Sequence, residues 1–149
     1  MEQLKRTTST DNKFKALVAL LDADLAERDG DDNAFYAQFN GIVHLNHCVV
    51  YYMEDLPVAC GAFKAFNETT IEVKRMFVLP GHRGKGIASK VLNELEHWAK
   101  ELNYSSSVLE TGLRQPEAIA LYKKNRYTIT PNYPPYEGME NSVCFHKLL

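Results

Sequence analysis

The stretch that decides the fold is Phe77-Val-Leu-Pro-Gly-His-Arg-Gly-Lys-Gly-Ile-Ala88 (FVLPGHRGKGIA). An apolar run ends at Pro80, three glycines and two basic side chains follow within six residues, and the chain then turns apolar again. Glycine lets backbone N–H groups approach a ligand closely, and the N-terminus of a helix favours negative charge. The stretch therefore predicts a phosphate-binding turn between a strand and a helix.

The residues before this turn predict an antiparallel meander. Strand-like runs cover Cys48–Met53, Pro57–Phe66 and Thr70–Leu79, and the turn residues between them are few enough for hairpins. Further upstream, the pattern predicts a short strand over residues 4–7. A long helix follows it, capped within residues 9–11, and its apolar residues, Leu20 among them, fall mostly on one face. A short helix over residues 33–39 comes next.

The residues after the turn predict alternating helices and strands. From Ile87 to Leu102, apolar side chains recur at spacings of three and four, which is typical of an amphipathic helix. A strand over residues 106–111, a helix beginning at Gln115, and strands over residues 127–130 and 142–148 complete the order β-α-α-β-β-β-α-β-α-β-β. Because the sequence contains no repeat and no linker-like segment, residues 1–149 are expected to form one domain.

Composition excludes several classes of function. The 149 residues carry a net charge of −2, which gives no electrostatic support for binding nucleic acid or a membrane surface. No apolar run approaches the roughly 20 residues that span a bilayer, and the polar N-terminus does not resemble a signal peptide. Cys48, Cys60 and Cys144 are too widely spaced for a zinc site and odd in number, so we expect reduced thiols, no metal and a cytoplasmic location.

Two well-known phosphate-binding motifs do not match the turn. A nucleotide P-loop requires GxxxxGK followed by Ser or Thr, whereas Lys85 is followed by Gly86 and preceded by Gly81 at the wrong spacing. A dinucleotide-binding turn requires GxGxxG in the first strand–helix unit, but Ser89 replaces the third glycine and three antiparallel strands come first.

A third pattern fits. Arg83-Gly-Lys-Gly-Ile-Ala88 matches R/Q-x-x-G-x-G/A, and the chain resembles the GNAT (Gcn5-related) N-acetyltransferase superfamily over nearly its whole length. The stretches Leu109–Gly112 and Gln115–Tyr122 resemble a large bacterial subgroup of it. The resemblance implies an α/β (α+β) fold with a mixed, mostly antiparallel sheet of about seven strands and four helices. It also implies direct acetyl transfer from acetyl-CoA, without a metal, to a primary amine of a small molecule or peptide.

The resemblance also implies where the cofactor binds. Backbone N–H groups of the turn would bind the pyrophosphate, and the strand before it would pair with the pantetheine arm and offer the Val78 N–H to the oxyanion. Gln115 stands where the family has a pantetheine-binding asparagine. The predicted cofactor-binding residues are Met76, Phe77, Val78, Arg83, Gly84, Lys85, Gly86, Ile87, Ala88 and Gln115.

Two side chains are the predicted catalytic residues. Tyr122 ends an A-x-x-L-Y pattern, where the family often has a tyrosine that protonates the leaving thiolate; the alternative is a buried structural tyrosine. Glu72 lies on the strand from which the histone-modifying branch draws its general base. It could equally be a strand glutamate paired with Lys74 or Arg75, and Glu110 is a second candidate for the base.

The acceptor is less well defined by the sequence. Six acids within residues 22–32 would attract a cationic amine such as a polyamine or a lysine side chain, or would be a solvated helix end. Tyr133 and Tyr136 are candidate walls of the acceptor site, or loop packing. His44 and His47 are expected at the surface or the edge of the core. A homodimer is compatible with the resemblance, and a non-catalytic acyl-CoA sensor is the alternative function.

One departure from the family pattern predicts local strain. Most members have glycine before the aromatic residue that follows the tyrosine helix, and this chain has Asn125-Arg126-Tyr127. Because arginine adopts a left-handed conformation less readily than glycine, we expect Asn125 to supply the turn or the helix cap to shift.

Overall fold

The sheet has seven strands in the order β1-β2-β3-β4-β5-β7-β6, and all neighbours are antiparallel except β4 and β5. The computed structural model describes residues 1–37 and 45–149, so His44 and the predicted helix end at residues 38–39 lie outside the described residues. The elements are β1 (Glu2–Thr7), α1 (Asn12–Asp29), the 3₁₀ helix η1 (Gly30–Asp32), α2 (Asn33–Ala37), β2 (His47–Met53), β3 (Leu56–Ala65), β4 (Thr70–Val78), the 3₁₀ helix η2 (Pro80–His82), α3 (Ile87–Glu101), β5 (Ser106–Gly112), α4 (Pro116–Lys124), β6 (Thr128–Thr130) and β7 (Ser142–Leu148). This order confirms the predicted fold class.

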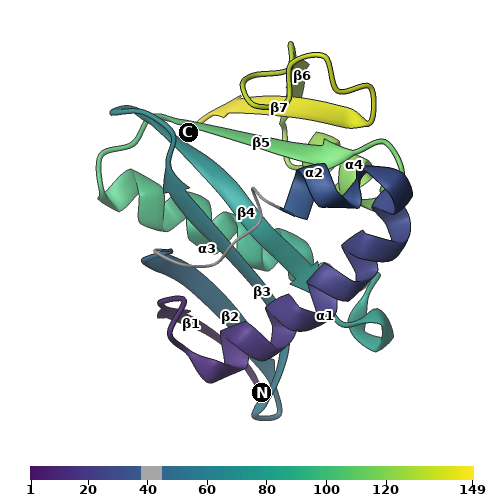
Figure 1. The fold of residues 1–149 in the computed structure, drawn as a ribbon. Helices are drawn as coiled ribbons and strands as arrows, with labels where there is room; N and C mark the ends of the chain where they lie inside the picture. Colours follow the sequence, from purple (N-terminus) through teal and green to yellow (C-terminus); the bar gives the residue numbers. More distant parts are fainter. Residues whose placement is uncertain (38–44) are drawn as a thin grey trace.

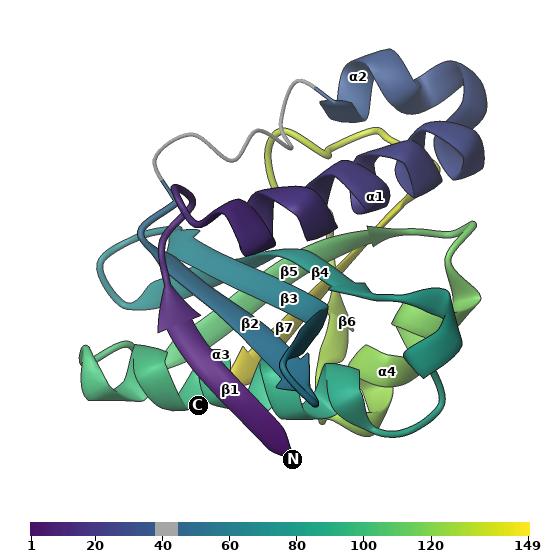
Figure 2. The same ribbon diagram turned by 90° about the horizontal axis from the view of Figure 1, so that it is seen from below.

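Helices cover both faces of the sheet. Figure 2 shows α1 and α2 on one face, with α3 and α4 on the other. The side chain of Asp11 accepts a hydrogen bond of 2.8 Å from the Lys13 N–H and so caps α1. Phe14 and Leu17 of α1 are buried against β2 and β3, whereas Leu20, which the sequence placed on the same helical face, is 51% exposed.

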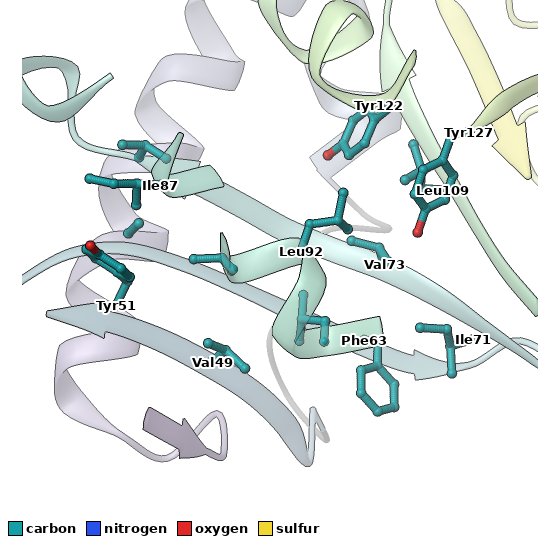
Figure 3. Close-up of a cluster of buried hydrophobic side chains, with 14 of the residues drawn as sticks. Val49, Tyr51, Phe63, Ile71, Val73, Ile87, Leu92, Leu109, Tyr122 and Tyr127 are labelled. Carbon is teal, nitrogen blue, oxygen red and sulfur yellow. The ribbon is translucent and has the colours of Figure 1, made fainter. Parts of the chain in front are cut away.

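The larger core lies beneath α3. Val91, Leu92 and Leu95 are fully buried against the central strands, as the spacing of apolar residues in this helix predicts. Figure 3 shows this cluster extending to Tyr122 of α4 and to Tyr127. None of the described helices is long and apolar enough to cross a lipid bilayer.

The three cysteines are free and buried. Burial raises the pKa of the Cys48 and Cys60 thiols to about 12 and that of Cys144 to about 11. They are therefore protonated and unreactive at neutral pH.

The sheet opens between its two halves. β4 and β5 are paired at three positions, from Thr70 opposite Ser106 to Glu72 opposite Val108. Figure 1 shows the two strands diverging beyond these pairs, so that their C-terminal ends leave a V-shaped gap. The fold thus exposes backbone groups of β4 just before the glycine-rich turn.

A bulge bends β4 inside this gap. Ala62 pairs with Lys74 and Cys60 with Phe77, so β4 contains one residue more than β3 over the same interval. Arg75 adopts a φ of 62° at the bulge, and its guanidinium forms an ion pair with Asp22 of α1. This ion pair holds α1 against the bent strand.

Candidate active site

The glycine-rich turn has the backbone geometry that an anion site requires. Gly84 and Gly86 have φ values of 80° and 79°, and a Cβ at either position would meet no atom within 4 Å. This side of the turn is therefore open, and positive φ accounts for glycine at both positions. Gly86 precedes the first turn of α3 without a capping side chain, which leaves the first N–H groups of the helix free for a ligand.

Arg83 shapes the turn. Its Nε donates a hydrogen bond of 2.8 Å to the Val78 carbonyl, and its guanidinium lies 5.5 Å from the centre of the Phe77 ring. The side chain thereby closes the turn back onto the end of β4.

A cavity of about 460 Å³ connects the turn to the gap in the sheet. It brings together most of the predicted cofactor-binding residues, with Ile87 and Lys85 as the exceptions. The Ile87 side chain is 2% exposed in the core, and Lys85 is exposed outside the cavity. The predicted residues that line the cavity are Met76, Phe77, Val78, Arg83, Gly84, Gly86, Ala88, Gln115 and Tyr122.

A second, smaller cavity of about 100 Å³ adjoins the first. Met76, Gln115 and Tyr122 line both cavities, so they mark the junction. Only the smaller cavity is lined by Tyr136 and by the acids Asp29, Glu72 and Glu110. We call the larger one the groove and the smaller one the acidic cavity.

Tyr122 lies at the junction, on α4. It is 6% exposed, its ring packs 5.9 Å from the ring centres of both Tyr127 and Phe145, and its hydroxyl makes no hydrogen bond within the described part of the chain. Burial, with a smaller contribution from the charge of Glu110, raises the pKa of its phenol. The phenol is therefore protonated at neutral pH and able to donate a proton or hydrogen bond to a group at the junction.

Glu72 is held by its neighbours. Its Oε2 accepts a hydrogen bond of 2.9 Å from the Tyr133 hydroxyl, and its Oε1 lies 3.8 Å from Lys64 Nζ and 3.9 Å from Lys74 Nζ. The pairing with Lys74 that the sequence offered as an alternative role is therefore present.

Glu110 lies on β5, across the gap from β4. Burial raises the pKa of its carboxyl to about 7, and the nearby charges of Asp29 and Glu72 contribute to the rise, although Ser142 and Lys74 oppose it. A carboxyl with this pKa accepts a proton near neutral pH, as a general base must.

The acid-rich segment has several separate roles. Asp22 is paired with Arg75, and Asp24 Oδ1 lies 3.2 Å from Arg28 Nε. The Nη1 of Arg28 pairs with Glu117 of α4. Asp29 is the one member of the segment that lines the acidic cavity, and burial raises its pKa. The end of α1 that carries Asp29 is held by Arg114, whose Nη1 donates hydrogen bonds to the carbonyls of Arg28 and Asp29, and the local sequence pattern gives no signal for these contacts.

The predicted aromatic walls are partly present. Tyr136 lines the acidic cavity together with Tyr36, which the sequence pattern did not single out, and their ring centres are 6.3 Å apart. Tyr133 does not line the cavity but contacts Glu72. His47 packs between Phe63 and Trp98, away from both cavities.

The turn after α4 differs from the prediction. Arg126 itself adopts the left-handed conformation, with a φ of 73°, whereas Asn125 has an ordinary φ of −92°. Asn125 Nδ2 donates hydrogen bonds of 3.0 Å to Ser89 and 2.9 Å to the Leu121 carbonyl, which fixes it in the helical conformation. The expectation that Asn125 supplies the turn was wrong.

Comparisons with known proteins agree with this geometry. The Acetyltransferase (GNAT) family matches residues 14–126. An IAA acetyltransferase of Azospirillum brasilense is 40% identical over 93 residues, which span 62% of this chain but only 61% of that relative. An acyl-CoA N-acyltransferase structure from Klebsiella pneumoniae covers 100% of this chain and 98% of its own, with a TM-score of 0.84 and 30% identity.

A more distant structure shares the fold. The PaiA N-acetyltransferase of Thermoplasma acidophilum, solved in complex with coenzyme A, has a TM-score of 0.75 at 12% identity and covers 100% of this chain and 99% of its own. Together with the family match over most of the sequence, these findings establish that the chain belongs to the GNAT acetyltransferase family.

Proposed function

We propose that this protein transfers an acetyl group from acetyl-CoA directly to a primary amine of a small molecule or peptide. The observation that carries the proposal is the continuous path from the open glycine turn, along the freed edge of β4, to Tyr122 at the junction with the acidic cavity. Family membership and the coenzyme A complex of the Thermoplasma protein agree with it.

The residues present fit acetyl-CoA. Gly84 and Gly86 leave room for a pyrophosphate against the backbone N–H groups at the start of α3. The backbone of β4 after Glu72 has no strand partner on the β5 side, so it is available to pair with the pantetheine arm as an added strand. Gln115, at the junction, is positioned to contact the same arm.

Transfer needs a base, an oxyanion donor and an acid. The attacking amine enters as an ammonium and must lose a proton, which we assign to Glu110 because Glu72 is already held by Tyr133 and two lysines. The Val78 N–H is the proposed donor to the oxyanion. Collapse of the tetrahedral intermediate breaks the C–S bond, and Tyr122 gives its proton to the departing sulfur.

A covalent route through cysteine is disfavoured. Direct transfer requires only that the amine reach the thioester, whereas a covalent route requires a nucleophilic thiolate beside it. None of the cysteines lines either cavity, and burial keeps all three thiols protonated. Within the described residues, no group of three or more His, Cys, Asp or Glu side chains could hold a metal ion.

Isothermal calorimetry with acetyl-CoA, followed by a thiol-release assay against a panel of primary amines, tests the proposal. Binding with CoA release on at least one amine is the expected result. Binding without release on any amine would favour the alternative function, a non-catalytic acyl-CoA sensor. If acetyl-CoA does not bind, the proposed function is wrong.

A further inference from the structure

One buried basic side chain in the acidic cavity has no role in the transfer proposed above. Lys74 lies on β4, two residues beyond Glu72, which is the last residue of β4 that pairs with β5. Lys74 therefore belongs to the edge of β4 that is available to the pantetheine arm. It lines the acidic cavity, and its side chain is only 8% exposed. Lysine is rarely buried to this degree unless it is paired, and the pairing with Glu72 keeps it in the cavity that the acetyl group would reach.

The surroundings of Lys74 favour its neutral amine. Its Nζ lies 3.9 Å from Oε1 of Glu72. Burial is the largest influence on the pKa of the ammonium and lowers it; the acids Glu72 and Glu110 oppose the fall, and the bases Lys64 and Arg75 add to it. The ammonium therefore loses its proton more readily than that of an exposed lysine, and the neutral amine is the form that attacks a thioester.

Lys74 shares the acidic cavity with the proposed acid of the reaction. Tyr122 and Glu110 line this cavity too, and the charge of Glu110 contributes to the pKa of both Lys74 and Tyr122. Tyr122 also lines the groove, at the junction where the acetyl group would arrive. The Lys74 amine therefore lies in the space that an acceptor amine would enter, and the fold holds it there, whereas an acceptor must be recruited from solution.

From these features we propose that Lys74 is a self-acetylation site: without an acceptor amine, its Nζ takes the acetyl group of acetyl-CoA bound in the groove. The inference rests on the proposed function and adds to it a modified residue of the enzyme itself. Acetylation would remove the positive charge of Lys74 from the acidic cavity and place an acetyl group in the space for the acceptor.

The reaction balances among the residues of the cavity. The Lys74 ammonium gives one proton to the neighbouring carboxylate of Glu72. The neutral Nζ attacks the carbonyl carbon of the thioester, a C–N bond forms and the C–S bond breaks. Tyr122 gives its proton to the departing sulfur, and the second proton of the nitrogen returns to the Tyr122 oxygen. The products are an acetylated Lys74 and free CoA, and the proton on Glu72 passes to solvent.

Peptide mapping of the purified protein tests the proposal. The protein is incubated with deuterium-labelled acetyl-CoA in a buffer without primary amines, then denatured and digested, and the labelled acetyl group on each lysine is measured by mass spectrometry. Lys64 is the matched internal control, because it also pairs with Glu72, at 3.8 Å, but is 52% exposed and lines neither cavity. We expect Lys74 to be labelled about tenfold faster than Lys64 or more, and excess unlabelled CoA to slow the labelling of Lys74 but not of Lys64.

Two variants repeat the comparison on the intact protein. Lys74→Arg should abolish the rapid uptake of one acetyl group per chain, whereas Lys64→Arg should retain it, as measured by intact mass. Calorimetry with acetyl-CoA shows whether each variant has kept the groove. The peptide map of the wild type does not depend on the folding of either variant.

The possible failures are distinguishable. If acetyl-CoA binds but Lys74 stays unlabelled, or is labelled no faster than Lys64, the self-acetylation inference is overturned and the acetyltransferase proposal stays intact. Rapid labelling of Lys74 that excess CoA does not slow also overturns the inference, because the acetyl group would not come from the groove. If acetyl-CoA does not bind, the proposed function itself is wrong.

Discussion

The Tyr133 hydroxyl donates a hydrogen bond of 2.9 Å to Glu72 across 61 residues of sequence. It joins the loop between β6 and β7 to the first half of β4, and the Tyr133 ring also packs edge-on against Tyr136, with ring centres 5.7 Å apart. Tyr133 therefore binds the carboxyl group of Glu72, a candidate base, and packs against Tyr136, which lines the acidic cavity.

Tyr133→Phe tests this relationship. Losing the hydrogen bond to a buried carboxylate should lower the free energy of unfolding by about 1–3 kcal/mol and raise KM for the amine more than it lowers kcat. Urea denaturation and steady-state kinetics measure the two effects. Tyr52→Phe, on β2 and outside both cavities, is the matched control. An unchanged KM would show that the loop does not help to form the acceptor site.

The assignment of the base to Glu110 predicts a pH dependence. In the wild type, kcat/KM should rise with pH through about 7 as the carboxyl loses its proton. Glu110→Gln should lower kcat/KM at pH 8 by roughly 100-fold and abolish this rise, whereas Glu72→Gln should lower it less than about tenfold. If Glu72→Gln lowers kcat/KM more than Glu110→Gln does, the general base is Glu72 and not Glu110.

Stability provides an independent readout of the same carboxyl group. Because its folded-state pKa of about 7 lies above the ordinary value of 4.5, the folded protein binds the proton more tightly than the unfolded chain. The contribution of Glu110 to the free energy of unfolding is therefore most favourable below pH 4.5. It falls as the pH rises to about 7 and is constant above that. Glu110→Gln should stabilise the protein by about 1–3 kcal/mol at pH 8 and by little at pH 4.5, as measured by denaturation at both values.

Tyr122→Phe should slow the release of CoA without weakening its binding. The phenylalanine ring preserves the packing against Tyr127 and Phe145 but removes the proton donor. We expect kcat to fall by roughly 100-fold and the dissociation constant for acetyl-CoA, measured by calorimetry, to change less than about twofold. If the Tyr122→Phe variant keeps the kcat of the wild type, Tyr122 has only a packing role in the core.

Gly86→Ala should weaken acetyl-CoA binding. An alanine at a φ of 79° is strained by roughly 1–2 kcal/mol, and its methyl group would occupy the open side of the turn. We expect the dissociation constant to rise about tenfold or more. Gly81→Ala is the control because Gly81 lies in the same turn with equal space and without positive φ. Equal effects of the two substitutions would argue against the proposed pyrophosphate site.

Arg126→Gly should stabilise the protein. Glycine relieves the left-handed strain at a φ of 73°, which we expect to raise the free energy of unfolding by about 0.5–1 kcal/mol. Lys123→Gly, within α4, should instead lower it by about 1 kcal/mol. Urea denaturation of both variants gives the comparison, and a less stable Arg126→Gly would mean that contacts of the arginine side chain outweigh the strain.

Local patterns were sufficient to predict the fold and the position of the glycine-rich turn between β4 and α3. The 3.6-residue period of α3, the alternating strands and the glycines at positions 84 and 86 each reflect constraints within a few residues. The resemblance that started from Arg83–Ala88 then led to a family that the comparisons confirm. Leu20 of α1 shows the limit of this reasoning. It is exposed, because the spacing of apolar residues does not determine where the buried face of a helix ends.

The sequence singled out Glu72, Glu110 and Tyr136 as candidates, but it could not predict how the acidic cavity assembles, because the assembly depends on distant partners. Nothing near Asp22 in the sequence identifies Arg75, and nothing near Glu72 identifies Tyr133. Likewise, Arg126 adopts the left-handed turn because Asn125 is held by Ser89 on another helix. Such pairs follow from tertiary packing, which overrides local propensity.

The short pairing between β4 and β5 also has a mechanical consequence. Three residue pairs join β4 to β5, and beyond them the two strands form no ladder of hydrogen bonds across the gap. If the pantetheine arm occupies that edge as proposed, it forms hydrogen bonds with the unpaired backbone of β4 and links β4 to β5 where the strands themselves are not paired. Binding would then stabilise the folded protein, and the resting enzyme would be a sheet that its own substrate completes.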